Sequence, residues 1–198
     1  FWLVEDRITA ARAATYSGVL TWLLAKPTEL RDSRSAEAAW DGQRLSITTA
    51  EPNVYLDLAI SPPERSALTH YVLRLYQSGP LARGEGRSLH TLFALCSGEG
   101  PAGLDVRPAG GRTVLIRDGA TGEIYLAGIG GLDRGELKIA AEAFLLAPGR
   151  CYLAGQDARG LFGSRPLTRG RTPDGLAETL AGWWKDSAGR PAAPVPAV

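Results

Sequence analysis

Successive short segments in which apolar and polar residues alternate are the feature that most constrains the fold of this chain. The segments NVYLDLAIS at 53–61 and ALTHYVLRLYQSG at 67–79 both alternate in this way. A period of two residues is typical of a β-strand with one buried face. Because such segments follow one another without helical segments between them, the pattern predicts an antiparallel sheet and not a series of strand–helix repeats.

Turn signals separate the predicted strands. Asp41–Gly42 and Pro62–Pro63 both lie next to alternating segments, and proline cannot continue a central strand. The clearest hairpin is RTVLIRDGATGEIYLAG at 112–128, with Asp118–Gly119 and Thr121–Gly122 in its turn. The region from 40 to 128 therefore predicts several strands joined by short connections.

A helix is predicted at the N-terminal end, because apolar residues recur there with a spacing of three to four residues. Pro27 limits this helix to about residue 25, since the residue before a proline avoids helical geometry. The predicted apolar face comprises Val4, Ile8, Ala11, Thr15, Val19 and Trp22.

A second helix is predicted at 172–187, TPDGLAETLAGWWKDS. Thr172 can cap it and Pro173 suits its first position. The segment at 189–198 is rich in proline and alanine and predicts an extended tail. The predicted apolar stripe of the helix comprises Leu176, Leu180, Trp183 and Trp184.

These patterns together predict an α+β fold in one domain over residues 1–188, followed by the tail at 189–198. The N-terminal amphipathic helix, an antiparallel sheet of about six to eight strands and the C-terminal helix are its parts. The segment GELKIAAEAFLLAPG at 135–149 fits either a helix or a strand.

Composition and motifs exclude several function classes. The formal net charge is +1, whereas a dedicated nucleic-acid-binding protein normally carries a strong basic excess. The sequence holds no P-loop, no H-E-x-x-H and no G-x-S-x-G motif, and its only histidines are His70 and His90. GEGPAG at 98–103 matches a dinucleotide-binding pattern, but strand and turn signals follow it where a helix would be needed. We therefore expect no nucleic acid, no metal and no cofactor.

The two cysteines, Cys96 and Cys151, have two interpretations. They are buried free thiols, as free cysteines often are, or they form one disulfide. A disulfide would indicate an exported or periplasmic protein, and free thiols would indicate a cytoplasmic one.

The best catalytic candidates are His90 and Cys96, because a thiolate beside an imidazole is a competent nucleophile pair and Glu99 could orient the imidazole. The spacing argues against direct contact. If the segment is a strand, residues six apart lie about 20 Å from each other. In a helix, they would lie about 9 Å apart on different faces.

Two further features are candidate binding residues. Arg165, Arg169 and Arg171, with Arg159, could pair with a phosphate, a carboxylate-rich partner or RNA. A solvated loop is the alternative that the sequence favours, since Asp157 and Asp174 balance the charge. Adjacent tryptophans on a helix point about 100° apart, so one of Trp183 and Trp184 can pack on the sheet while the other lies at a groove edge or an interface.

Phe1 and Glu5, followed by a helix and then strands, resemble type IV pilins and pseudopilins. The resemblance implies an exported domain with an N-terminal membrane anchor. Asp6 and Arg7 depart from that pattern, and the longest charge-free run, Ala13–Ala25, has about 13 residues where a spanning helix needs about 20. No membrane span is therefore expected in this chain, and the alternative is a pseudopilin-like domain without its anchor.

Three functions remain open. The first is a non-catalytic structural, assembly or protein-binding subunit whose partners are other protein subunits, and the sequence favours it because no catalytic set appears. The second is a small enzyme whose active site is assembled from distant residues such as His90, Cys96, Glu136 and Glu142. The third is a domain that binds a small ligand in a half-open sheet. The oligomeric state is not indicated.

Overall fold

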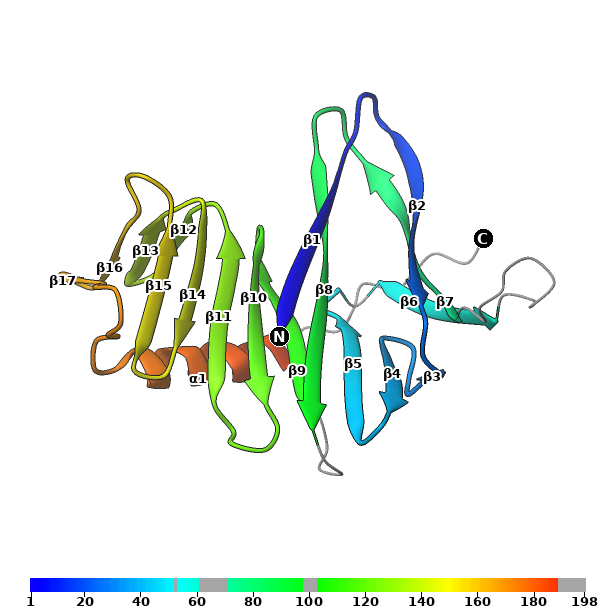
Figure 1. The fold of residues 1–198 in the computed structure, drawn as a ribbon. Coiled ribbons are helices and arrows are strands. Elements are labelled where there is room, and N and C mark those ends of the chain that lie inside the picture. The colour runs from blue at the N-terminus through cyan, green and yellow to red at the C-terminus, as the bar shows by residue number, and fades with distance from the viewer. Residues whose placement is uncertain (52, 61–70, 98–102, 189–198) are drawn as a thin grey trace. The chain divides into compact units, whose positions relative to one another are not determined.

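The computed structural model of the chain is mostly β-structure, and it describes residues 1–51, 53–60, 71–97 and 103–188 (Figure 1). These residues form seventeen strands in four sheets and a single helix. The chain separates into two compact units, unit 1 within Phe1–Ala102 and unit 2 within Gly103–Pro191. Whether the two units fold as one domain, as the sequence predicts, stays a prediction.

Unit 1 consists of two antiparallel sheets. The five-stranded sheet has the order β1 (Trp2–Thr9), β8 (Gly86–Ser97), β5 (Gln43–Thr49), β4 (Ser35–Trp40) and β3 (Thr28–Leu30). The three-stranded sheet has the order β2 (Ala14–Leu24), β7 (Tyr71–Leu81) and β6 (Val54–Ile60).

The core of unit 1 lies between these two sheets, because its buried residues come from both. Trp22 of β2 meets Phe93 of β8 edge to face, with 4.9 Å between the ring centroids. The buried residues are Ala36, Ile47, Val54, Leu56, Leu73, Leu75, Leu89 and Phe93. Six hydrophobic residues around them are only half-buried: Val4, Leu20, Trp22, Leu24, Leu45 and Leu58.

The predicted N-terminal helix is wrong, since residues 2–24 form β1 and β2. Exposure alternates residue by residue along β2, with Leu20 and Trp22 on the core side and Val19 and Leu23 facing solvent. The apolar residues of this segment satisfy both a helical and an alternating spacing, and the threonines, tyrosine, valine and tryptophan in it favour a strand. Pairing of β2 with β7 along its whole length then determines the structure.

The resemblance to pilins loses its structural basis with this helix. The described residues begin with strand β1, whose Glu5 carboxylate accepts a hydrogen bond of 2.6 Å from Ser88 Oγ on β8. The order of a long helix followed by a sheet is therefore not found.

Unit 2 also contains two antiparallel sheets. One has the order β15 (Arg150–Ala154), β14 (Ala143–Ala147), β11 (Ile124–Ile129), β10 (Thr113–Asp118) and β9 (Leu104–Gly110). The other has the order β12 (Leu132–Arg134), β13 (Leu137–Ala140), β16 (Arg159–Phe162) and β17 (Arg165–Pro166). The segment at 135–149, which fitted both kinds of structure, forms the strands β13 and β14.

The predicted hairpin at 112–128 is confirmed. β10 and β11 pair in antiparallel register, with Leu115 opposite Leu126. Asp118 closes the turn, because its Oδ1 accepts a hydrogen bond of 2.8 Å from the amide of Ala120.

The C-terminal helix is confirmed as α1 (Leu176–Ala188), although it begins four residues after the predicted cap Thr172. Leu176, Leu180 and Trp184 are buried, and α1 packs against β9 and β11. Those three side chains join a core that also contains Leu115, Leu126, Leu137, Ile139, Phe144, Leu146, Cys151, Phe162 and Leu167.

The α+β fold class is therefore wrong as a whole, and the antiparallel pairing within it is right. The prediction of about six to eight strands was too low, because the segment read as the first helix and the segment left open at 135–149 both form strands. The predicted tail at 189–198 lies outside the described residues, as does most of the glycine-rich segment at 98–103.

Candidate functional site

The candidate catalytic residue His90 pairs with Glu51, a residue that the sequence did not single out. Nδ1 of His90 lies 2.6 Å from Oε1 of Glu51, and the amide of His90 donates a hydrogen bond of 2.8 Å to Oε2. Oγ1 of Thr49 also donates to Oε2, over 3.3 Å. An ionised carboxylate only accepts hydrogen bonds, so this geometry places the imidazole proton on Nδ1.

Burial gives the pair a structural role. His90 is 2% exposed, and its Nε2 has no hydrogen-bond partner among the described residues. A general base must come within hydrogen-bond reach of the proton that it removes, and this nitrogen does not reach the surface. The pair ties the segment after β5 to β8, since Ala50 also donates to the carbonyl oxygen of His90 over 3.1 Å.

Cys96 does not join this pair. It lies on β8 with His90, six residues further along the strand, which separates the two by about 20 Å. Glu99, the acid predicted to orient the imidazole, lies outside the described residues. The structure thus brings an acid to His90, but from a position 39 residues away in the sequence.

Both cysteines are free in the structure, Cys96 half-buried in unit 1 and Cys151 buried in unit 2. Burial raises the pKa of the Cys151 thiol, because the thiolate would lose its hydration. A thiol with a raised pKa is a poor nucleophile, so Cys151 is a core residue in this state. The disulfide between the two stays a prediction.

Trp183 and Trp184 both contact arginines of their own unit. The guanidinium of Arg107 lies 3.9 Å from the ring centroid of Trp184, and that of Arg134 lies 4.0 Å from the ring centroid of Trp183. Arg107 also donates a hydrogen bond of 3.1 Å to the carbonyl oxygen of Trp184. Trp184 is 6% exposed and Trp183 is half-buried, so these contacts attach α1 to its unit.

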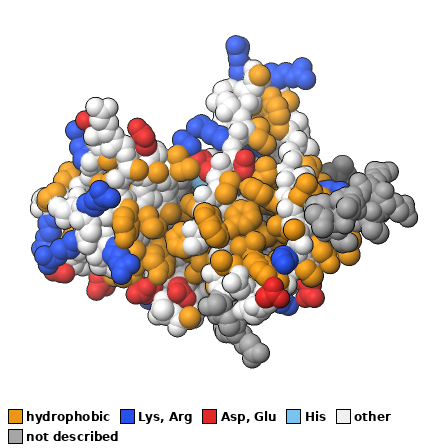
Figure 2. All heavy atoms as spheres, viewed as in Figure 1, with side chains coloured by type: hydrophobic (Ala, Val, Ile, Leu, Met, Phe, Trp, Pro, Cys, Tyr) orange, Lys and Arg blue, Asp and Glu red, His pale blue; other side chains and the backbone are white. Residues whose placement is uncertain are grey.

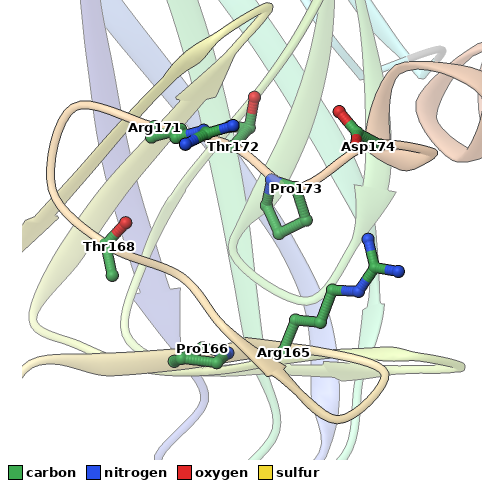
Figure 3. A pocket seen from close by; sticks show the side chains of 7 residues that line it. All are labelled: Arg165, Pro166, Thr168, Arg171, Thr172, Pro173 and Asp174. Carbon is green, nitrogen blue, oxygen red and sulfur yellow. The ribbon is translucent and has the colours of Figure 1, made fainter.

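Two of the predicted binding arginines line one pocket of unit 2 (Figure 3). The pocket has a volume of about 200 Å³. In Figure 3, the side chain of Arg165 extends from β17, and that of Arg171 extends from the turn before α1, on the other side of Pro173. Arg169 and Arg159 are exposed and are not part of its lining. The complete lining is Arg165, Pro166, Thr168, Arg171, Thr172, Pro173 and Asp174.

The side of the three-stranded sheet of unit 1 that faces away from the core is apolar and exposed, and we call it the outer face. Val19, Leu23 and Tyr55 on it are 53%, 67% and 56% exposed. Tyr55 stacks on Tyr76, with 4.8 Å between the ring centroids. The outer face comprises three rows of paired residues across β2, β7 and β6: Val19, Tyr76 and Tyr55; Thr21, Arg74 and Asp57; Leu23, Val72 and Ala59.

Strand β2 is also an unprotected edge. It pairs only with β7 among the described residues, and its sequence ATYSGVLTWLL holds no charged residue and no proline. Proteins usually protect such edges with lysine, proline, bulges or a covering segment. The opposite edge, β6, is partly covered, because Leu56 donates a hydrogen bond of 2.9 Å to Ser33.

Sequence reasoning missed this surface, although its signal was present. The charge-free run that contains β2 belongs to the segment predicted as the N-terminal helix, whereas its alternation places Val19 and Leu23 on one face of a strand. Figure 2 shows hydrophobic side chains gathered between the positions of β8 and β2 in Figure 1, on the side where the two sheets of unit 1 pack together and not on the outer face.

The residues with described positions contain no group of three or more histidine, cysteine, aspartate or glutamate side chains that could hold a metal ion. Within the same parts of the chain, no helix has the length and the apolar character needed to cross a membrane. In comparisons with known proteins, no family model, no curated protein and no solved structure matches the chain.

Proposed function

We propose that this chain is a non-catalytic protein-binding subunit that takes an extended segment of a partner protein onto strand β2. The observation that carries the proposal is the eleven-residue edge strand without a charge or a proline. The backbone groups on one side of an edge strand have no partner in their own sheet, so another strand can add to them.

The outer face supplies the side-chain half of such an interface. Val19 and Leu23 on β2 are both more than half exposed, and Val72 and Tyr76 lie directly beside them on β7. Large exposed apolar patches mark interaction surfaces in proteins that are otherwise folded normally. An added strand would pair with the backbone of β2 and extend this apolar face.

The polar row of Thr21, Arg74 and Asp57 lies between the two apolar rows and would make the surface selective for particular partner segments. Nη1 of Arg74 lies 3.3 Å from Oδ2 of Asp57, and both side chains remain more than a third exposed. An exposed ion pair contributes little to stability, but it sets which charges a partner can place opposite it. The surface therefore combines non-directional apolar contact with one polar row that fixes the register.

The test is the mass in solution of the protein isolated from its native source, compared with that of the purified chain. We expect an assembly larger than the chain alone, and we expect Val19→Lys and Leu23→Lys to release the chain from it. Lysine on an exposed edge strand hinders the addition of another strand. Near-ultraviolet circular dichroism checks that the variants remain folded.

Leu161→Lys is the matched control. Leu161 is 44% exposed and lies on β16 in unit 2, so the substitution adds the same charge at a comparably exposed apolar position. The proposal is wrong if the chain has its monomer mass in the native preparation, or if Leu161→Lys releases it as completely as Val19→Lys does.

A further inference from the structure

We propose that the pocket formed by Arg165 and Arg171 in unit 2 binds the phosphate group of a phosphomonoester. This inference is independent of the protein-binding surface on unit 1. It rests on the backbone that holds the two arginines, on the charges around them and on the size of the pocket.

The backbone on both sides of the pocket is fixed by hydrogen bonds. Arg165 belongs to β17, where it pairs with Phe162 of β16. Arg171 donates its amide hydrogen to the carbonyl oxygen of Thr168 over 3.1 Å, and the amide of Gly170 donates to Cys151 over 3.0 Å. The two arginines are therefore attached to the sheets of unit 2 and do not lie on a free loop.

Leu167 anchors the segment between the two arginines. Its side chain is 6% exposed within the core of unit 2, and its amide donates a hydrogen bond of 2.8 Å to Gly160. Gly170 has a φ of 87°, a left-handed conformation that favours glycine, and it lets the chain turn back before Arg171. These contacts fix the backbone from which the two arginine side chains extend, so less freedom is lost when a ligand binds than on a mobile loop.

The charge around the pocket is unbalanced. Neither Arg165 nor Arg171 makes an ion pair with a described residue, and Asp174 is the only acidic residue in the lining. Thr168 and Thr172 also belong to the lining, and a threonine hydroxyl can donate to an anion. The lining thus contains two arginines and two threonines, with a net charge of +1.

The number of donor groups selects the class of anion. A phosphomonoester offers three strong acceptor oxygens at neutral pH. These oxygens can accept from both guanidinium groups, whereas the two oxygens of a carboxylate are occupied by one bidentate arginine. The volume of about 200 Å³ is below the ~300 Å³ of the smallest drug-sized sites, so it suits one such group and not a large ligand.

The test is a calorimetric titration of the whole chain with glycerol 3-phosphate, and with acetate for comparison. We expect binding of glycerol 3-phosphate and no measurable binding of acetate. Arg165→Gln and Arg171→Gln should each weaken the binding by about tenfold or more, because each removes charge-assisted hydrogen bonds. Both side chains are exposed, and the melting temperature checks that the variants fold.

Arg159→Gln and Arg169→Gln are the matched controls, since both arginines lie in the same stretch of sequence outside the pocket. They should change the affinity by less than about twofold, as removal of a distant exposed charge does at moderate salt. Equal losses in all four variants would reveal non-specific attraction and overturn the proposal, as would an absence of binding to the unaltered chain.

Vesicles of phosphatidylcholine with and without phosphatidic acid distinguish a soluble ligand from a lipid headgroup. Retention on phosphatidic acid that Arg165→Gln abolishes would assign the pocket to a headgroup, and no retention would assign it to a soluble phosphomonoester. Retention on vesicles without any binding of glycerol 3-phosphate contradicts the proposal, since the shared phosphate would then not be what is recognised.

Discussion

Unit 1 and unit 2 are both built from antiparallel sheets, but they cover their apolar surfaces differently. In unit 2, helix α1 lies on β9 and β11 and buries Leu176, Leu180 and Trp184. Unit 1 has no helix among its described residues, and it leaves Val19 and Leu23 of β2 more than half exposed. The described residues of this chain thus close one apolar surface, on unit 2, and leave another, the outer face of unit 1, exposed.

The first prediction compares a tryptophan of each unit, and it has the largest expected effect. Trp184→Ala should lower the free energy of unfolding by about 3–5 kcal/mol, because it removes a buried ring and the contact with Arg107. Trp22→Ala should cost about 2 kcal/mol, since Trp22 is only half-buried at the margin of its core. Denaturant unfolding curves measure both values.

The same curves test whether the two units fold as one domain. If they do, both variants shift a single transition. If they fold separately, each variant shifts the transition of its own unit and leaves the other in place. A cost for Trp22→Ala that equals the cost for Trp184→Ala would contradict the difference in core closure between the units.

The strands that were predicted correctly are those whose local pattern has one interpretation. In the hairpin at 112–128, alternation and the turn at Asp118 agree, and the structure forms β10 and β11 there. In β2, the same apolar residues fit a helix and a strand, and only pairing with β7 decides between them. That pairing joins residues that are 47 to 67 positions apart, from Leu24 with Tyr71 to Ala14 with Leu81, so a local pattern could not supply it.

The site residues show the same division. The arginine-rich stretch was found because its charges lie close together in sequence, and two of its members line one pocket. The acid predicted to orient His90 is Glu99, which is close to it in sequence, whereas the acid that pairs with it is Glu51, 39 residues away. The contact depends on the register of β5 against β8, which composition and spacing do not specify.

The second prediction concerns this buried polar pair in unit 1. Glu51→Ala should destabilise the protein by about 3 kcal/mol, because it leaves the amide and the Nδ1 hydrogen of His90 buried without an acceptor. Glu51→Gln keeps one acceptor oxygen in place and should cost less, about 1 kcal/mol. Thermal and denaturant unfolding of the purified variants measure the difference.

Glu29→Ala provides the control for this pair. Glu29 is 77% exposed and lies 3.7 Å from Arg31, so its removal should change stability by less than about 0.5 kcal/mol. If Glu51→Ala is no more costly than Glu29→Ala, the pair does not hold unit 1 together, and the structural role assigned to His90 is wrong.

The third prediction has the smallest expected effect. Unit 2 should lose part of its folding stability at alkaline pH. Burial and a hydrogen bond of 2.8 Å to Glu123 raise the pKa of Tyr125 to about 12, from 10.0. The folded state therefore holds this proton more tightly than the unfolded state does. The resulting stability is fully present below about pH 10 and is lost as the pH rises towards 12. Unfolding measured at intervals across that range should show a decline that Tyr125→Phe reduces, because phenylalanine has no proton to lose. If Tyr125→Phe leaves the decline unchanged, the sensitivity does not come from Tyr125, and it no longer separates unit 2 from unit 1.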